Sequence, residues 1–185
     1  MSLIIKDCPR GIDKEIDFLQ KKIYENLIEL GWTNYDSYPR AYKNYKAGQL
    51  IPEIYIGNKE YSECLFNDKL NATSFFVASD NKKQINPGVY EQGVSIIFQV
   101  KLNALYPSIL HRADEEAQED VISAIIKDQQ EIDIDSIKIG VDNVYSEFVF
   151  NNDYDKRIKI TDMSDYHVFR IDFTLNYTNN SCKCP

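Results

Sequence analysis

Few residues in this sequence are placed to do covalent chemistry. The histidines, His111 and His167, lie far apart, and each reads as a structural residue rather than a base. Asp133 and Asp135 form a carboxylate pair that could serve general acid–base catalysis, but no base, nucleophile or glycine-rich loop lies near them. No local nucleophile motif supports a Ser-His-Asp or Cys-His arrangement. The sequence therefore does not predict an enzyme.

Metal and cofactor sites are equally weakly supported. Cys182 and Cys184 could supply two thiolates, but no second Cys or His pair stands at zinc-binding spacing. Glycine totals 7 residues, and no glycine-rich phosphate loop is present. We therefore expect no metal and no cofactor. The four cysteines of the chain are scattered, and in a reducing compartment this pattern predicts free thiols at Cys8, Cys64, Cys182 and Cys184.

Acidic residues gather at the start of one predicted helix. One interpretation is structural: they complement the helix dipole and form a solvated face. The other is functional: symmetry copies of the helix would make a ring of negative charge facing a lumen or a subunit interface, or the acids would bind a divalent cation. A dedicated cation site normally converges its ligands through a loop, and no calcium-loop pattern is present. The residues are Asp114, Glu115, Glu116, Glu119 and Asp120.

An aromatic and apparently irregular segment spans residues 32–49. Its aromatic residues are Trp32, Tyr35, Tyr38, Tyr42 and Tyr45. They either cover one edge of the core or form an exposed contact surface. Arg40, Lys43 and Lys46 interleave with them, as stacking on single-stranded nucleic acid would require. The acidic balance of the chain weighs against that interpretation, and Pro39 bars a continuous helix here.

Composition limits the class of protein. Of the 185 residues, 43% are hydrophobic and 27% are charged, which is typical of a soluble globular chain. The net charge of −8 comes without any long basic run, so tight nucleic-acid binding is not expected. No apolar run approaches the roughly 20 residues of a membrane span. The first residues lack the apolar region of a signal peptide, so we expect a protein made and kept in a cytoplasm.

A long strand followed by a helix organises the predicted fold. The strand covers Gly88–Leu105, with apolar residues alternating on one face and a single breach at Ile97. A helix from Arg112 to Asp128 follows, with apolar residues at spacing four. An earlier helix runs from Asp13, the expected N-cap, to Leu30, and Gly31 is its expected stop.

Shorter strands complete the prediction. We expect strands at Leu50–Ile56 and Tyr61–Phe66, joined by a turn at Gly57-Asn58, and others at Ser74–Ala78, Val144–Phe150 and Tyr166–Tyr177. Residues 79–87 read as an exposed loop, either a hairpin tip or a subunit-contacting arm. Residues 178–185 read as a flexible tail. The sequence thus predicts one α+β domain over residues 1–185, with a mostly antiparallel sheet and both helices on one face.

This layout resembles a family of viral structural proteins. The amphipathic helix Ile12–Leu30, the long strand Gly88–Leu105 leading into the acidic-headed helix Arg112–Asp128, and the apolar strand Phe169–Tyr177 together resemble the tail terminator and head–tail connector (neck ring) proteins of tailed bacteriophages. The richness in Tyr, Asn, Lys and Ile is similar to that of a phage of an AT-rich host, such as a crAss-like phage. The resemblance has no diagnostic motif and carries over no site residues.

The resemblance implies a structural role in a virion. Copies would form a hexameric or dodecameric ring in the neck or tail, next to portal, connector or tail proteins, after assembly in the host cytoplasm. DNA would pass through the lumen without specific binding. An acidic surface is compatible with such passage. The alternative from a different class is a small soluble α+β domain that binds a partner or ligand through the aromatic segment 32–45.

Overall fold

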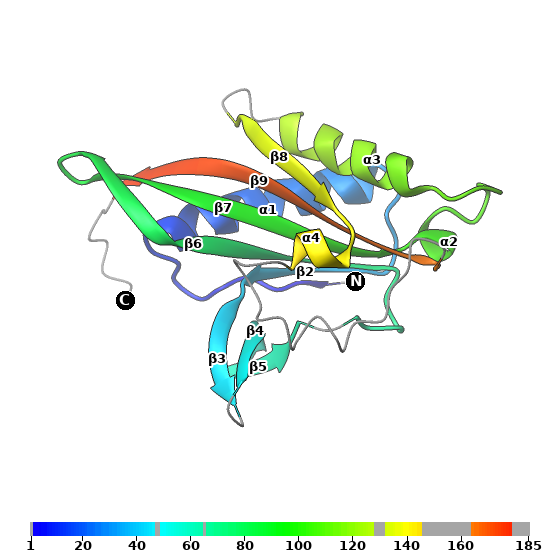
Figure 1. Ribbon diagram of the computed structural model, residues 1–185, viewed down its shortest axis with the longest axis horizontal. Helices are drawn as coiled ribbons and strands as arrows, with labels where there is room; N and C mark the ends of the chain where they lie inside the picture. The colour runs from blue at the N-terminus through cyan, green and yellow to red at the C-terminus, as the bar shows by residue number, and fades with distance from the viewer. Residues whose placement is uncertain (1, 47–48, 65, 128–131, 146–163, 179–185) are drawn as a thin grey trace.

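The computed structural model of the chain describes residues 2–46, 49–64, 66–127, 132–145 and 164–178. A six-stranded sheet runs through it in the order β1-β2-β6-β7-β9-β8 (Figure 1). The strands are β1 Ser2–Leu3, β2 Tyr35–Arg40, β6 Ala72–Asn86, β7 Val89–Lys101, β9 Tyr166–Thr178 and β8 Ile134–Ile139. The β1–β2 and β2–β6 pairs are parallel, and the remaining pairs are antiparallel. The α+β class is confirmed, and the sheet is mixed.

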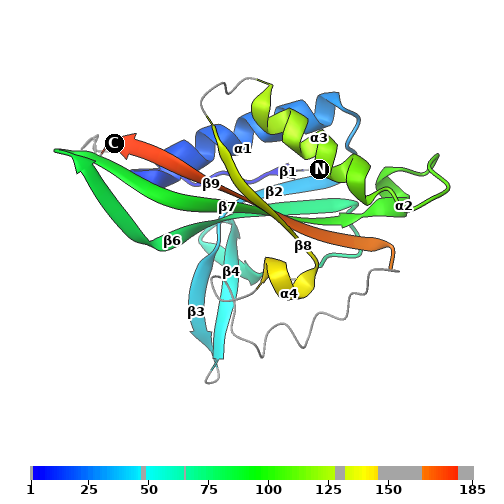
Figure 2. The same ribbon diagram turned by 45° about the horizontal axis from the view of Figure 1, so that its top comes forward.

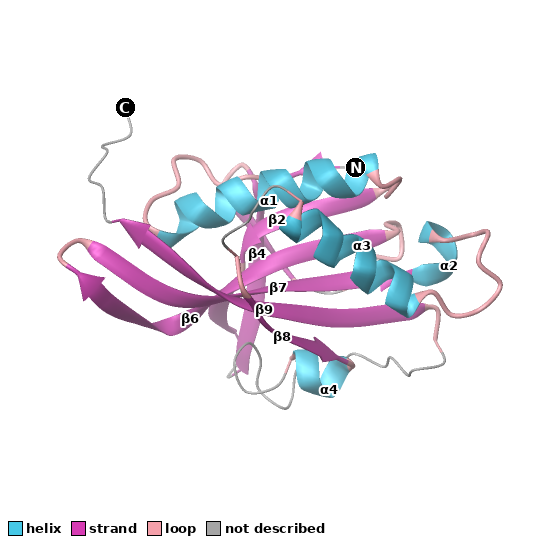
Figure 3. Ribbon diagram, turned by 90° about the horizontal axis from the view of Figure 1, so that it is seen from above, coloured by secondary structure: helices cyan, strands magenta, loops and turns pink. Residues whose placement is uncertain are grey.

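The two main helices lie side by side on one face of this sheet. Helix α1 covers Ile12–Glu29 and helix α3 covers Asp114–Ile126. Seen from above, both helices lie over the strands (Figure 3). Asn26 on α1 donates a hydrogen bond of 3.0 Å to the carbonyl oxygen of Ala124 on α3. The main hydrophobic core fills the space between this helix pair and the sheet.

Both faces of β7 are buried, which explains the breach in its alternation. Ile96 and Phe98 point into the helix-side core, whereas Ile97 belongs to a second apolar cluster with Phe75 and Tyr145. Helix α4, Val141–Val144, contributes to that second cluster. A strand with buried residues on both faces loses the polar side that alternation would otherwise show. Ile97 therefore marks a second core, not an error of register.

A small three-stranded sheet extends below the main sheet (Figure 2). It contains β3 Tyr42–Lys46, β4 Gln49–Gly57 and β5 Glu60–Glu63, all antiparallel. The predicted turn at Gly57-Asn58 is confirmed by the β4–β5 hairpin, where Gly57, Asn58 and Lys59 all have positive φ. The prediction that residues 32–49 are irregular was wrong, because β2 and β3 occupy most of this stretch.

The ends of α1 differ in how well they were predicted. Gly31, with φ of 94°, closes the helix as expected: its N–H bonds the Ile28 carbonyl and the Trp32 N–H bonds the Leu27 carbonyl, both at 3.0 Å. This is a Schellman arrangement. Asp13 does not cap the helix, because the N-cap is Gly11 and Asp13 lies inside the first turn. Its carboxylate forms ion pairs instead.

Residues 79–86 belong to strand β6 rather than to the predicted loop, and Pro87 lies in the turn, so the hairpin-tip alternative for this stretch is confirmed. The β6–β7 hairpin continues through the pairs Lys82 with Gln92 and Gln84 with Tyr90. Its two-residue turn contains Gly88, with φ of 77°, which glycine adopts without strain. We define residues 80–91 as the arm; it projects from one end of the sheet (Figure 1). The expected exposure is confirmed, since residues 80–88 are all exposed.

Several predicted boundaries shift or fall outside the described residues. The long strand ends at Lys101, and Leu102–Leu105 form the short helix α2. Of the predicted strand Val144–Phe150, Val144 instead closes α4, and residues 146–150 lie outside the described part. The last strand, β9, is confirmed. Thr178 ends β9, and the remainder of the predicted tail lies outside the described residues.

Candidate functional site

Asp120, one of the five acids on α3, is a structural residue. Its Oδ2 accepts a hydrogen bond of 2.9 Å from Trp32 Nε1 and one of 2.6 Å from the Tyr106 hydroxyl. Burial and the neighbouring Asp120 carboxylate together raise the pKa of Tyr106. The Schellman turn after α1 places Trp32 for this contact. Asp120 thus joins the end of α1 and the segment after α2 to α3, and its carboxylate is engaged in these contacts.

The other four acids divide into paired and exposed residues. Asp114 lies 3.5 Å from Arg112, and Glu116 lies 3.8 Å from the exposed ring of His111. Glu115 and Glu119 are exposed on the first turns of α3. The acids therefore do not converge on one point, and no group of three or more metal-ligating side chains occurs in the part of the chain that the structure describes.

The aromatic segment does not form one surface. Trp32 and Tyr35 are buried in the helix-side core, and the Tyr35 hydroxyl lies 2.6 Å from Ser74 Oγ. These two residues fit the first expectation, that of covering the core. Tyr38 is half-buried against the second apolar cluster, Tyr42 is half-buried on the small sheet, and Tyr45 is 70% exposed. An aromatic contact surface can therefore include only the second half of the segment.

Tyr42 belongs to a cavity of about 210 Å³ beside the small sheet. We define the tyrosine pocket by its lining residues: Lys6, Asp7, Pro39, Tyr42, Tyr55, Lys59 and Tyr61. The Tyr61 ring centroid lies 6.1 Å from that of Tyr42, edge-to-face, and 5.6 Å from that of Tyr55. The sequence analysis did not single out Tyr55 and Tyr61 as candidate contact residues. Their positions on either side of the correctly predicted Gly57-Asn58 turn were the available signal.

An ion-pair cluster around the buried carboxylate of Asp13 holds one wall of the tyrosine pocket. The Asp13 carboxylate lies 2.5 Å from the Lys6 amine and 2.6 Å from Arg40 Nε. Burial alone would raise the pKa of Asp13, but the hydrogen bonds from Arg40 and Lys6 outweigh it and lower the pKa. Lys6 also donates to the Tyr42 hydroxyl at 3.1 Å, and Arg40 stacks over the Tyr42 ring at 4.7 Å. The cluster thus fixes Tyr42 to α1 and to the N-terminal segment.

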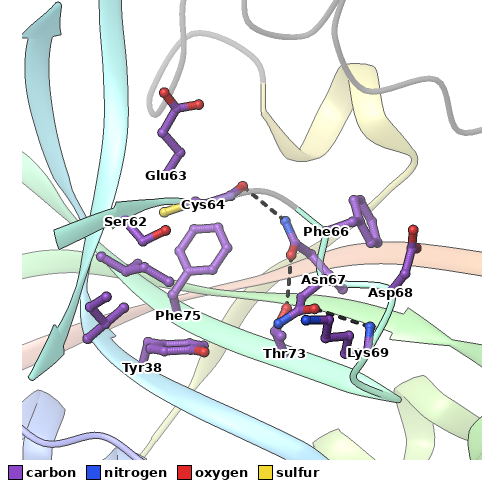
Figure 4. Close-up of a pocket in the computed structure, with 13 residues that line it drawn as sticks. Tyr38, Ser62, Glu63, Cys64, Phe66, Asn67, Asp68, Lys69, Thr73 and Phe75 are labelled. Carbon is purple, nitrogen blue, oxygen red and sulfur yellow. Dashed lines mark hydrogen bonds between the residues drawn. The ribbon is translucent and has the colours of Figure 1, made fainter.

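A second cavity, of about 420 Å³, opens on the sheet face opposite the helices (Figure 4). Phe75 and Tyr38 line it, and Thr73 donates to Gln99 Oε1 at 2.9 Å. Gln99 in turn donates to the Tyr145 hydroxyl at 2.8 Å, so its polar atoms are satisfied. The thiol of Cys64, also in the lining, is buried, and burial raises its pKa. It remains protonated at neutral pH and is a weak nucleophile.

The remaining candidate residues have structural surroundings. His167 is buried, stacks on Phe169, and lies 3.2 Å from Gln118 Nε2, as a core histidine does. Asp135 accepts a hydrogen bond from Thr174 at the sheet surface, and Asp133 is exposed. The expectation of free thiols is wrong for Cys8, which is disulfide-bonded. Cys64 is a free thiol as expected, and Cys182 and Cys184 lie outside the described residues.

Comparisons with protein-family models and with curated proteins find no match for this chain. Within the described residues, no helix combines the length and the apolar character needed to cross a membrane. The geometry of the molecule is therefore the basis on which a function can be proposed. Its exposed features are the arm, the acidic start of α3 and the tyrosine pocket.

Proposed function

We propose that this protein is a structural subunit of a tailed bacteriophage. Copies assemble into a ring in the neck or tail, as a tail terminator or head–tail connector, and DNA passes through the lumen. The subunit is assembled in the host cytoplasm and retained in the virion. The observation that carries the proposal is the arm, in which β6 presents an exposed strand edge beyond the end of its pairing with β2.

An extension of this kind calls for a partner. β2 pairs with β6 only as far as Phe76, so in the described residues the outer edge of β6 from Val77 to Asn86 has no neighbouring strand. On its other side the arm is tied to the sheet, because β7 pairs with β9 as far as Val89 with Thr178. Only the β6 edge is open, and open strand edges pair readily with other chains. Lys82 and Lys83 protect this edge from indiscriminate pairing. In a self-assembling subunit, such an arm can reach a neighbouring copy and pair with it.

The charge distribution is compatible with a conduit for DNA. The chain has a net charge of −8, and Glu115 and Glu119 are exposed near the start of α3. DNA adheres to proteins mainly through cations that replace its counterions. A lumen lined with carboxylates would lack that attraction and let the genome slide. We assign Glu115 and Glu119 to the lumen or its mouth, and we place Asp114 and Glu116 beside them.

Light scattering coupled to size exclusion tests the proposal. With a subunit mass of 21.5 kDa, a ring of six or twelve copies is readily distinguished from a monomer. We expect a discrete closed oligomer, visible as a ring with an open lumen in electron micrographs. A protein that stays monomeric at every concentration, and also when mixed with portal and tail proteins of its phage, would contradict the proposal.

The second candidate is a small binding domain that uses the second half of the aromatic segment. The tyrosine pocket favours it, because aromatic walls with a few charged groups are typical of ligand sites. A monomer whose melting temperature rises on addition of one class of small ligand, with the rise lost in Tyr42→Ala, would favour this function over the ring.

A further inference from the structure

A polar cleft lies beside the open edge of β6. β2 follows this edge until the Ala41 N–H bonds the Phe76 carbonyl at 2.7 Å, and the chain then turns away into β3. Beyond that point a cleft of about 430 Å³ lies between the outer part of β6 and the start of α1. We call this cleft the slot. Its walls include Arg10, Gly11, Ser79, Lys82, Tyr90 and Tyr177. A strand added to β6 where β2 ends would run past the slot.

The two acids that line the slot are already engaged by cations. Asp13 lies 2.5 Å from the Lys6 amine and 2.6 Å from Arg40 Nε, so one carboxylate faces two positive groups. Asp80 lies 2.8 Å from the Lys43 amine. Counted with these partners, the acids leave no excess of negative charge in the slot.

Two further cations line the slot without an acidic partner. Arg10 is exposed just before α1, and Lys82 is exposed on β6. Neither side chain forms an ion pair within the part of the chain that the structure describes. The Lys82 amine lies 5.3 Å from the centroid of the Tyr90 ring, so it lies against a wall of the slot. The slot is therefore positive in a chain whose net charge is −8.

The open edge and the two cations together select an acidic peptide in an extended conformation. An open strand edge presents N–H and C=O groups that another backbone strand can satisfy. Nucleic acid has no such backbone ladder, and a basic peptide would bring its charges against Arg10 and Lys82. Carboxylates would neutralise both cations, and charge complementarity of this kind selects the partner and fixes its register.

We propose that the slot binds an extended, acidic segment of a neighbouring subunit, which adds a strand to the open edge of β6 and places carboxylates beside Arg10 and Lys82. The segment takes the position next to β6 that β2 leaves at Phe76. This inference deepens the role of the arm, and it rests on the proposed virion assembly for the source of the segment. The slot itself is present in every copy, so peptides can test it directly.

A set of peptides tests strand addition. The probe is the fluorescein-labelled peptide amide Val-Glu-Val-Glu-Val-Glu, and its binding is followed by fluorescence anisotropy. We expect it to bind at least about tenfold more tightly than Val-Lys-Val-Lys-Val-Lys. Methylation of its backbone nitrogens keeps the charge but removes the N–H donors, and should weaken binding at least about tenfold. Equal binding of the methylated peptide, or equally tight binding of single-stranded DNA, would overturn strand addition.

Charge reversal tests the two cations. Arg10→Glu combined with Lys82→Glu should weaken binding of the acidic peptide at least about tenfold, because both exposed cations become acids. The control is Lys14→Glu combined with Lys69→Glu, which makes the same change of net charge at exposed positions outside the slot. Its affinity should stay within about threefold of the unmodified protein, because salt screens distant surface charges. Equal losses in the two variants would overturn the assignment of Arg10 and Lys82.

Light scattering separates failure of the slot from failure of the ring. If the slot holds a neighbouring subunit, the variant with reversed Arg10 and Lys82 should not assemble, and excess acidic peptide should release subunits from the unmodified ring. A ring that forms in this variant and resists the peptide would overturn the slot and leave the ring intact. A monomer that binds the acidic peptide would support the slot and contradict the ring. A monomer that does not bind it would overturn both.

Discussion

The inner and outer halves of the β6–β7 hairpin are continuous strands with opposite surroundings. From Ala72 to Val77, every residue of β6 is buried, whereas residues 80–86 are all exposed. β7 runs the other way, from the exposed tip into the core. Every residue from Val94 to Val100 is buried, and the polar ones among them are Ser95 and Gln99. The inner half is covered by helices on one face and the second core on the other. The same backbone ladder thus serves the fold at one end and, we propose, assembly at the other.

This contrast separates stability from association. Substitutions in the inner region and its supporting contacts should change the free energy of unfolding, because they disturb close packing and buried hydrogen bonds. Substitutions in the arm and at the exposed acids should change contacts between molecules and leave the fold intact. Measurements of stability and of association on single variants therefore show whether a residue supports the fold or mediates contacts between molecules.

Trp32→Ala should have the largest effect. It removes a fully buried indole that packs edge-to-face on Tyr35 and Phe98, and it leaves Asp120 without one of its donors. We expect a loss of about 3–5 kcal/mol of unfolding free energy in urea denaturation. Tyr45→Ala, at 70% exposure, is the control and should change it by less than about 0.5 kcal/mol. Similar losses for the two variants would remove the distinction between the halves of the aromatic segment.

Asp13→Asn should have an intermediate effect. The amide keeps the shape of the side chain but removes the charge that faces Lys6 and Arg40, so both cations lose their partner. Because Lys6 and Arg40 are partly exposed, water compensates in part, and we expect a loss of about 1–3 kcal/mol at pH 7. Urea denaturation of the variant and the unmodified protein at the same ionic strength measures the difference.

Asp13→Asn and the unmodified protein should also differ in how their unfolding free energy depends on pH. The lowered pKa of Asp13 means that the unfolded chain takes up its proton before the folded one does. The stabilisation is therefore complete above the ordinary value of 3.8 and is lost as the pH falls through the lower pKa of the folded state. We expect Asp13→Asn to reduce the acid sensitivity of unfolding between pH 5 and 3, about one unit either side of the ordinary value. An identical acid slope in both proteins would show that Asp13 is not the responsible group.

The inner region was largely predictable from the sequence, and the arm was not. The alternation of Val94 to Val100 and the helical spacing of Ala117, Val121 and Ile125 are local patterns, and the elements follow from them. The polar run Asp80–Gln84 has no strand propensity of its own. Its strand conformation is imposed by pairing with β7. Local composition therefore indicated a loop where the partner strand makes a ribbon.

The candidate contacts were beyond the sequence for a different reason. Trp32 and Asp120 meet across 88 positions, and Tyr42 meets Tyr61 through the fold of the small sheet. No local pattern distinguishes the acid that binds Trp32 from Glu119 beside it. Sequence patterns indicate elements, whereas which polar or apolar residue remains exposed depends on how distant elements pack.

Shortening the arm should leave the fold stable and abolish assembly. Lys82 and Gln92 are paired across the hairpin, so residues 83–91 can be replaced by Asn-Gly, which closes a two-residue turn. The change also removes the pairing of residues 89–91 with the end of β9 and the stack of Tyr90 on Tyr177, so a loss of about 1–3 kcal/mol is expected. Light scattering should report monomers or small oligomers. A ring of unchanged mass would show that the arm is not an assembly element.

The smallest effect on stability, and the most specific one on function, belongs to the exposed acids. Glu115→Lys combined with Glu119→Lys reverses two charges that form no described ion pair, so the unfolding free energy should change by less than about 0.5 kcal/mol. If these residues line a lumen, every copy adds its two cations to the same channel. The reversed ring should then retain duplex DNA, with an affinity that falls steeply as salt rises, because cations release counterions from the phosphates. The unmodified ring should not retain it.

Asp142→Lys, an exposed acid on α4 at a different face, is the control that raises the charge without placing it on α3. Equal DNA retention by the control and the α3 variant would place Glu115 and Glu119 outside the channel, even if the ring itself forms.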